Sequence, residues 1–466
     1  MMDASKFIKN GNRARLFSTY KSSQIEQRLL STTLSSIVTA QPLAEKISSK
    51  FGLRIGTRAE IFAYTEVHLL KGDKLSKRPD GFIIVNTGRK TWTALVEAKA
   101  NDAQIDKKQI ENYISLARVN NIDAVITISN ELTLTPSTNP SGIKLPKNST
   151  VGLFHLSWAS LMTECEMLLG DGKKEFNNDD EIYLISELLR YYSDKSSGVT
   201  GFTQMNKEWP DLVDLIISGK RLNQKDPIVE STLLAWHQKL RDLSLKLSRS
   251  LNQVVTLSLS QKQKIDLSLR VKNDIERLIN KSALKAFINI PNASSNLELE
   301  IQLDKRTITT SMEVNVPLNK KSNTAKLNWV LRQLSDSKIN QLLFELNLKN
   351  KKSDEILLLS PKDEAPTEIN NLGEVTRVRV GMNIDNSKDF KSRKKIVELV
   401  QNSSLLFYRE VGQKLKSYIP EPPKIKKDTE EKSSDEQEKQ TVEAPPSWTT
   451  TWLDNNEDSN QSTEKK

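Results

Sequence analysis

The chain is organised around residues 78–113, which read RPDGFIIVNTGRKTWTALVEAKANDAQIDKKQIENY. The segment Pro79–Val85 is apolar and β-branched after its first residues, as expected for a buried strand. The tetrapeptide Asn86–Arg89 predicts a tight turn, because asparagine and glycine tolerate the positive φ angles that hairpins need. Residues 91–100 return as a second strand. The stretch therefore predicts a β-hairpin that is followed at once by a helix.

Two carboxylates and one ammonium group converge in this hairpin. Side chains alternate along a strand, so Glu97 and Lys99 lie on the same face of the second strand. In an antiparallel pair, Asp80 at the start of the first strand lies close to Glu97 near the end of its partner. Each element taken alone also fits an ordinary solvated strand face. Together they place the three charged groups on one patch.

This combination of groups suits metal-assisted phosphodiester hydrolysis. Mg²⁺ prefers oxygen ligands and is usually held by one or two carboxylates together with water and substrate phosphate. An adjacent ammonium can orient the attacking water or neutralise the charge that develops in the transition state. We therefore predict that Asp80 and Glu97 bind Mg²⁺, with Mn²⁺ as an alternative ion, and that Lys99 acts beside the attacking water.

The order of these motifs resembles that of the PD-(D/E)xK nuclease superfamily. Pro79-Asp80 and Glu97-Ala98-Lys99 fit its signature without departure. The resemblance covers about residues 24–190 and implies a restriction-endonuclease-like fold, which is a mixed central sheet flanked by helices. It also implies the catalytic roles of Asp80, Glu97 and Lys99.

The helix after the hairpin adds a second resemblance. Gln109 and Tyr113 are one turn apart and therefore share one face of the helix. This spacing resembles the Gln-x-x-x-Tyr motif of RecB-type nuclease domains, which implies that both residues position the substrate backbone. We assign Arg78 to substrate binding as well. An ordinary amphipathic helix would explain Gln109 and Tyr113 equally simply.

Glu26 is a further candidate for the catalytic site. Leucine and isoleucine recur at helical spacing over residues 24–38, and Glu26 lies at the start of this predicted helix. Nucleases of the superfamily often place a glutamate on the helix before the core strands, where it supports the metal. Glu26 fits equally well a charge that complements the helix dipole. Both interpretations stay open at this point.

Further strands and helices complete the predicted nuclease-like domain. Strands are expected over residues 60–70, 123–129 and 153–157, and helices begin at Trp158 and at Glu181. The run 123–129 is continuously apolar, which indicates a strand buried on both faces of a mixed sheet. Glu66 and His68 share one face of the first of these strands. They either border the site or lie at an edge of the sheet.

The composition describes a polar chain without a membrane span or an intramolecular disulfide. Of its 466 residues 36% are hydrophobic, and no run of about eighteen apolar residues occurs. The single cysteine, Cys165, fits a reducing compartment. The histidines are His68, His155 and His237, too far apart in sequence to indicate a zinc site. We therefore expect a cytoplasmic protein with no membrane partner.

The charge is unevenly distributed. The net charge is +10, from 69 basic and 59 acidic residues. Residues 428–466 contain 4 lysines and 11 acidic residues, a balance of −7, so the remainder carries 65 basic and 48 acidic residues, a balance of +17. A basic body favours a polyanionic partner, and we expect nucleic acid, most simply DNA.

Composition and periodicity divide the chain into five parts. Residues 1–23 are basic and rich in serine, and they predict a mobile arm. Residues 24–193 hold the nuclease-like domain, and residues 194–228 form a linker that begins Asp-Lys-Ser-Ser-Gly. Residues 229–419 predict an α+β domain of unassigned role. Residues 420–466 predict a disordered acidic tail.

Two features outside the nuclease-like domain could serve as contact surfaces. Lys391, Arg393, Lys394 and Lys395 form a basic cluster that either touches phosphates or is a solvated helix face. In the tail, Trp448 and Trp452 stand out among polar residues and suggest a docking motif for a protein partner.

The sequence therefore predicts an α/β protein that is a Mg²⁺-dependent deoxyribonuclease, with defence, repair and stress response as compatible settings. Two alternatives stay open. The first is a non-catalytic nucleic-acid-binding or regulatory protein that retains the nuclease fold. The second is an assembly scaffold, which a large exposed apolar patch on residues 229–420 would favour.

Overall fold

The computed structural model describes most of the chain. Its described residues are 4–71, 78–146, 148–170, 175–349 and 355–419. The predicted tail with Trp448 and Trp452 lies outside the described residues. The described part is a mixed α/β structure with two sheets and eleven α-helices. Among these residues no helix has both the length and the apolar character needed to cross a membrane.

The first sheet has six strands in the order β1-β2-β3-β4-β5-β6. The first four strands pair antiparallel, whereas β4, β5 and β6 pair parallel. The sheet is therefore mixed, as predicted. Its strands are β1 (Ile8–Arg13), β2 (Glu60–Leu69), β3 (Gly81–Asn86), β4 (Thr91–Ala98), β5 (Ala124–Ser129) and β6 (Gly152–Ser157).

The predicted hairpin joins β3 and β4. Gly88 has a φ of 80°, and its N–H donates to the side chain of Asn86 over 3.0 Å. The N–H of Thr87 donates to the carbonyl of Lys90, which closes the turn. The prediction of a turn at these residues is thus confirmed, for the predicted reason that glycine adopts a left-handed conformation there.

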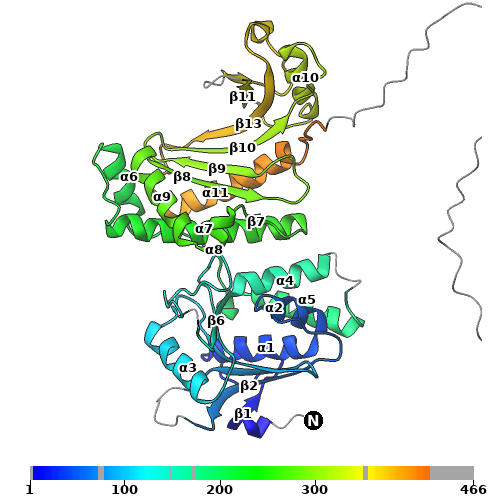
Figure 1. Ribbon diagram of the computed structural model, residues 1–466, viewed down its shortest axis with the longest axis vertical. Coiled ribbons are helices and arrows are strands. Elements are labelled where there is room, and N and C mark those ends of the chain that lie inside the picture. The colour runs from blue at the N-terminus through cyan, green and yellow to red at the C-terminus, as the bar shows by residue number, and fades with distance from the viewer. Residues whose placement is uncertain (1–3, 72–77, 147, 171–174, 350–354, 420–466) are drawn as a thin grey trace, which may run out of the picture. The chain divides into compact units, whose positions relative to one another are not determined.

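Helices cover both faces of this sheet (Figure 1). On one face the apolar residues of four helices pack against the inward side chains of the strands; these helices are α1 (Ile25–Thr39), α2 (Gln41–Ser49), α4 (Trp158–Gly170) and α5 (Asp179–Ser193). On the other face lies α3 (Lys107–Val119), which also supplies the crossover from β4 to parallel β5. Because successive side chains of a strand point to opposite faces of the sheet, neighbouring residues of β4 belong to different cores. Val96 lies in the first core and Leu95 in the second.

Gly81 allows α1 to approach the sheet closely. A Cβ atom on this residue would lie 3.1 Å from Leu34 Cδ1 and 3.3 Å from Leu30 Cδ2. A side chain at this position would require these leucine side chains of α1 to move. Because Asp80 directly precedes β3 and Glu26 lies on α1, this contact helps to set the distance between them.

The expected mobile arm at residues 1–23 is wrong for its central part. Residues Ile8–Arg13 form β1, which pairs antiparallel with β2, and a short 3₁₀ turn (Ala4–Lys6) precedes it. Ile8 is buried, while the other five residues of the strand are exposed. The strand forms because the free edge of β2 offers backbone hydrogen bonds, which the polar side chains of the segment do not reveal.

The second sheet is entirely antiparallel and has seven strands in the order β12-β11-β13-β10-β9-β8-β7. Its buried residues alternate with more exposed ones, as along β9 and β11. One face is therefore apolar and the other polar. The strands are β7 (Thr256–Leu257), β8 (Ala283–Asn289), β9 (Leu297–Gln302), β10 (Thr307–Asn315), β11 (Leu342–Leu348), β12 (Glu355–Leu359) and β13 (Val375–Asp385).

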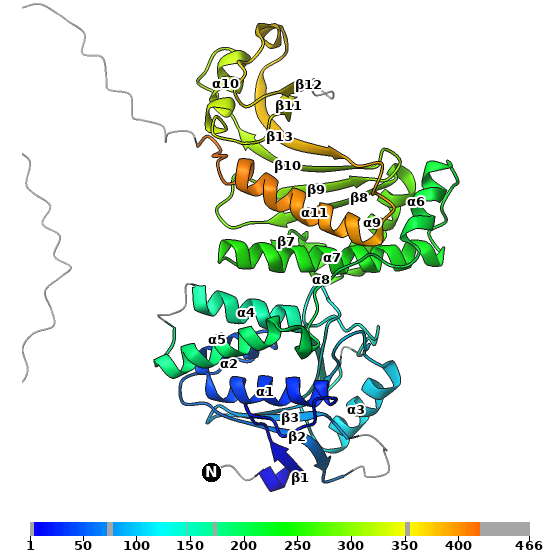
Figure 2. The same ribbon diagram turned by 180° about the vertical axis from the view of Figure 1, so that it is seen from behind.

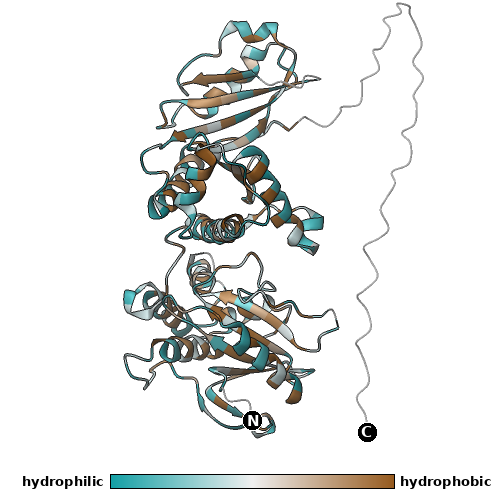
Figure 3. Cartoon of the chain, turned by 90° about the vertical axis from the view of Figure 1, so that its left-hand side faces the viewer, coloured by the Kyte–Doolittle hydropathy of each residue, from teal (hydrophilic) through white to brown (hydrophobic). Residues whose placement is uncertain are grey.

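Helices pack against the apolar face of the second sheet (Figure 2). They contribute to one large core, which is separate from the two cores of the first sheet. Apolar residues gather in the strands and along the helices of both parts (Figure 3). The helices are α6 (Trp209–Ile217), α7 (Pro227–Leu251), α9 (Ser268–Lys281), α10 (Asn323–Gln333) and α11 (Arg393–Phe407). The short α8 (Gln261–Ile265) precedes α9.

Two expectations for this half of the chain need correction. The predicted linker 194–228 contains α6, whose Trp209 is fully buried in the second core and donates from Nε1 to the carbonyl of Phe390 over 2.9 Å. The sequence also predicts two closing helices, over residues 388–402 and 404–418, whereas the structure has one helix, α11, which runs into a π-helical turn (Tyr408–Gly412). Short 3₁₀ turns lie at Lys195–Ser197 and Thr367–Asn371.

Candidate functional site

Asp80 lies directly before β3 and reaches across to the end of β4. Its Oδ2 accepts a hydrogen bond of 3.0 Å from the N–H of Ala98. Because Gly81 pairs with Val96, the neighbouring Asp80 lies opposite Glu97. Burial and then the charge of Glu97 raise the pKa of Asp80 to about 8, although the Ala98 N–H and Lys99 act in the opposite direction. The negative charge of Glu97 thus disfavours ionisation of the Asp80 carboxyl group.

Glu97 is the most deeply buried charged group of the site. Only 1% of the residue is exposed. Its Oε1 forms a hydrogen-bonded ion pair with Nζ of Lys99. Its Oε2 is buried and has no hydrogen-bond partner among the described residues. A buried carboxylate oxygen without a partner is costly, so this atom is a natural ligand for a cation.

Lys99 lies between the acidic groups. Its Nζ contacts Glu97 and lies 4.0 Å from Oε2 of Glu26. Burial alone would lower the pKa of Lys99, but the charges of Glu97, Asp80 and Glu26 outweigh burial and raise the pKa. The side chain therefore carries its positive charge. The backbone of Lys99 is fixed too, because its carbonyl accepts from Nε1 of Trp158 over 2.7 Å.

Glu26 belongs to the same cluster. It lies in the first turn of α1, and its Oε1 accepts from the N–H of Ala100 over 3.2 Å. The contact with Lys99 and the hydrogen bond to the end of β4 connect α1 to the site. The position in the first turn also suits the helix dipole. Glu26 thus lies both at the helix start and beside Lys99, and its support of a metal ion stays a prediction.

Gln109 and Tyr113 form a short chain of hydrogen bonds with Arg78. Nε2 of Gln109 donates to the hydroxyl of Tyr113 over 3.1 Å, and that hydroxyl donates to the carbonyl of Arg78 over 2.8 Å. The helix start is capped by Asp106, which accepts from the N–H of Gln109. The chain fixes the backbone just before Asp80.

Tyr113 differs from its expected role. Its side chain is fully buried, so it does not contact a substrate directly. Burial and then the charge of Glu97 raise the pKa of Tyr113, which keeps the hydroxyl protonated and able to donate. We assign Tyr113 to the support of Arg78 and Gln109. Gln109 is partly exposed and Arg78 is exposed, as their predicted substrate contacts require.

Glu66 and His68 lie beside the site rather than in it. Glu66 has a left-handed φ of 52°, and its N–H donates to the carbonyl of Asp80 over 3.0 Å. Its carboxylate accepts from Nδ2 of Asn12 in β1. His68 pairs with Asn10 of β1. Glu66 on β2 therefore supports the backbone of Asp80, and β1 in turn contacts Glu66 through Asn12.

A divalent ion at this site would depend on two carboxylates. Among the described residues, no group of three or more His, Cys, Asp or Glu side chains could hold a metal ion. Asp80 and the unpaired Oε2 of Glu97 fit the smaller set that Mg²⁺ uses when water and phosphate complete its shell. The donor set is all oxygen, as a hard cation requires.

The basic cluster at residues 391–395 is largely occupied by protein contacts. Lys391 pairs with Asp214, and Lys395 pairs with Asp389. Arg393 donates from Nε to the carbonyl of Met205 over 2.8 Å. These contacts favour a structural role over phosphate binding for this cluster.

Similarity to known proteins does not add to this geometry. Comparison of the chain with models of protein families, with curated proteins and with solved structures yields no significant match.

Proposed function

We propose that this chain is a Mg²⁺-dependent nuclease with a restriction-endonuclease-like fold, and that it hydrolyses phosphodiester bonds of DNA. The observation that carries the proposal is the meeting of Asp80, Glu97 and Lys99 at the end of one hairpin. The mixed sheet with helices on both faces supports the fold assignment. The two carboxylates and the ammonium group belong to the residues whose order resembles the superfamily motif, namely Asp80, Glu97 and Lys99.

Asp80 and Glu97 would hold the metal ion. When bound, Mg²⁺ would stabilise negative charge on the phosphate and make a bound water more acidic. Glu97 offers an oxygen that has no other partner among the described residues, and Asp80 offers a carboxylate whose ionisation a cation would favour. The high pKa of Asp80 means that the cation must displace a proton below about pH 8.

Lys99 would act on the reacting phosphate. Its ammonium is held between Glu97 and Glu26, so its position is defined before the substrate arrives. A fixed positive charge stabilises the transition state without reorganisation at the moment of reaction. Glu26 would keep Lys99 in place, and Gln109 would contact the substrate backbone beside it.

We propose DNA as the substrate for two reasons, which are the basic charge of the chain and the resemblance of its motif to that of nucleases. The chain outside residues 428–466 has a balance of 65 − 48 = +17, which attracts polyanions. Binding that depends on this charge should weaken steeply as salt increases. Defence, repair and stress response are settings in which such an enzyme would act.

The test is a cleavage assay on the full chain. Duplex DNA, single-stranded DNA and RNA are incubated with the protein in Mg²⁺, Mn²⁺ or EDTA. We expect metal-dependent cleavage that falls by at least about 10²-fold in Asp80→Asn and Glu97→Gln. The matched control is Glu111→Gln, which changes an exposed carboxylate on the solvent side of α3. If wild type and Asp80→Asn show the same cleavage with and without metal, and both still bind nucleic acid, the protein is a non-catalytic nucleic-acid-binding protein.

A further inference from the structure

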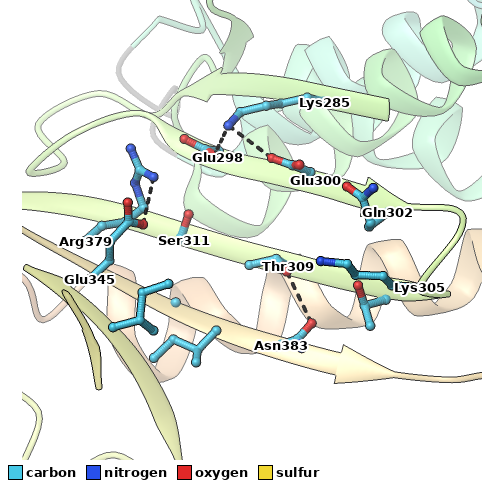
Figure 4. Close-up of a pocket in the computed structure, with 14 residues that line it drawn as sticks. Lys285, Glu298, Glu300, Gln302, Lys305, Thr309, Ser311, Glu345, Arg379 and Asn383 are labelled. Atoms are coloured by element: carbon cyan, nitrogen blue, oxygen red, sulfur yellow. Dashed lines mark hydrogen bonds and ion pairs between the residues drawn. The ribbon is translucent and has the colours of Figure 1, made fainter. Parts of the chain in front are cut away.

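The polar face of the second sheet contains a hollow that the nuclease site does not use. The helices of this part contribute to the core on the opposite, apolar face. Side chains of β8, β9, β10, β13 and β11 line the hollow, whose volume is about 350 Å³ (Figure 4). Small-molecule pockets have volumes of about 300–1,000 Å³. The hollow is therefore large enough for a small ligand, on the order of one sugar ring or one nucleoside.

Two small residues form its floor. Ser311 of β10 pairs directly with Gly381 of β13, and Leu343 of β11 pairs with Gly381 on the other side. A Cβ atom on Gly381 would lie 3.4 Å from Cβ of Ser311 and 3.7 Å from Cβ of Leu343. A side chain at this position would therefore project into the hollow between these two residues. Longer side chains, Arg379 and Asn383, stand on the same strand to either side of Gly381.

Ser311 offers a polar group on this floor. The residue is 97% buried, since its exposed fraction is 3%, and it lines the hollow. Its hydroxyl oxygen does not belong to the described buried atoms that lack both solvent contact and a hydrogen-bond partner. The hydroxyl therefore keeps contact with solvent in the hollow, where a polar atom of a ligand can replace water as its partner.

The charges around the floor neutralise one another. Three basic residues (Lys285, Lys305, Arg379) and three acidic residues (Glu298, Glu300, Glu345) line the hollow, so the balance is 3 − 3 = 0. Lys285 pairs with Glu298 and Glu300, and Arg379 pairs with Glu345. An anion such as a phosphate would gain no net attraction here. The paired groups still have spare donor and acceptor positions, because a guanidinium has five N–H groups and a carboxylate about four lone pairs.

We propose that this hollow binds a small, uncharged molecule rich in hydroxyl groups. Such a molecule can donate to the carboxylates and accept from Arg379 and Ser311 without loss of an ion pair. Leu343 and the exposed Ile356 lie at one end of the hollow, where they would contact an apolar ring face. Sugars and nucleosides share this chemistry. The site is independent of the nuclease proposal and would give the second half of the chain a ligand-sensing role.

The test uses the full chain and two neutral probes, glucose and adenosine, with adenosine monophosphate as the charged counterpart. Binding is measured by saturation-transfer NMR and calorimetry. We expect one neutral probe to bind, and the monophosphate to bind no more tightly than adenosine. Gly381→Val should abolish binding, because its side chain would project into the hollow. Asn315→Val, an exposed position on β10 outside the hollow, should bind as wild type does.

Ser311→Ala gives a second and independent readout. It should weaken binding about twofold to tenfold, as expected for one hydrogen bond, without a decrease in Tm, because the hydroxyl contacts solvent in the hollow. This variant decides the question if Gly381→Val fails to fold. The proposal is overturned if neither neutral probe binds, if the monophosphate binds more than about tenfold more tightly than adenosine, or if Ser311→Ala lowers Tm and leaves binding unchanged.

Discussion

Replacement of Lys99 by methionine should lower the free energy of unfolding, because it leaves the buried carboxylate of Glu97 without its ammonium partner. Lys99→Met keeps most of the apolar stem but removes the ammonium that pairs with Glu97. Glu97 is 1% exposed, so its carboxylate would be left without a cation in a low-dielectric environment. Loss of one partner from a buried ion pair costs about 3–5 kcal/mol. The Lys99 side chain is 18% exposed, so water can partly replace it and we expect the lower end, about 3 kcal/mol.

A divalent cation should reverse part of this loss. If Asp80 and Glu97 bind Mg²⁺, the ion restores a positive charge next to the unpaired carboxylate. A ligand at one hundred times its Kd adds about 2.7 kcal/mol to stability. The increase with Mg²⁺ should therefore be larger for Lys99→Met than for wild type, in which the ammonium and the ion compete for Glu97.

Urea unfolding followed by circular dichroism provides the assay. Wild type, Lys99→Met and the double variant Glu97→Gln/Lys99→Met are compared in EDTA and in Mg²⁺. The double variant removes both charges, so it should be more stable than Lys99→Met in EDTA and should gain little from Mg²⁺. The reasoning is refuted if the single variant is as stable as wild type in EDTA, or if Mg²⁺ stabilises the double variant as much as the single one.

Three further perturbations test other parts of the structure. Tyr113→Phe removes the hydroxyl that donates to the carbonyl of Arg78; it should cost about 1 kcal/mol in urea unfolding and reduce cleavage without loss of metal binding. His155 is buried and its pKa is lowered to about 4, so the unfolded state binds a proton first as pH falls. Stability should therefore decrease from pH 6.5 to about pH 4 by up to about 1.4 kcal/mol per pH unit, and His155→Gln should flatten this part of the profile. Gly81→Ala would bring a methyl group to 3.1 Å from Leu34, and calorimetry should show a loss of about 1–3 kcal/mol; unchanged stability would mean that α1 does not pack as described.

The hairpin and its charged patch could be predicted because they depend on local rules. Strand alternation alone places Glu97 and Lys99 on one face, and the structure joins them in an ion pair. The short turn at Gly88 then sets the register that brings Asp80 opposite Glu97. These inferences need only neighbouring residues, so no knowledge of distant contacts was required.

Other features depend on contacts between distant segments. The segment Ile8–Arg13 has one buried side chain, and it becomes a strand only because β2 offers a free edge. The hydrogen bond from Ala100 to Glu26 depends on how closely α1 approaches the sheet, which Gly81 permits. The one-turn spacing of Gln109 and Tyr113 likewise does not reveal that the Tyr113 ring is fully buried. The sequence predicts an α+β domain over residues 229–419, but the hollow at Gly381 exists only in the paired sheet.

The central claim is that Asp80 and Glu97 together hold one divalent ion. The most direct measurement is a titration of the metal-free full chain with Mn²⁺, with the free ion followed by electron paramagnetic resonance. The account predicts one bound Mn²⁺ in wild type, with affinity at least about tenfold weaker in Asp80→Asn and in Glu97→Gln. The exposed control Glu111→Gln should bind as wild type does. Affinity in Asp80→Asn or Glu97→Gln equal to that of wild type would contradict the claim.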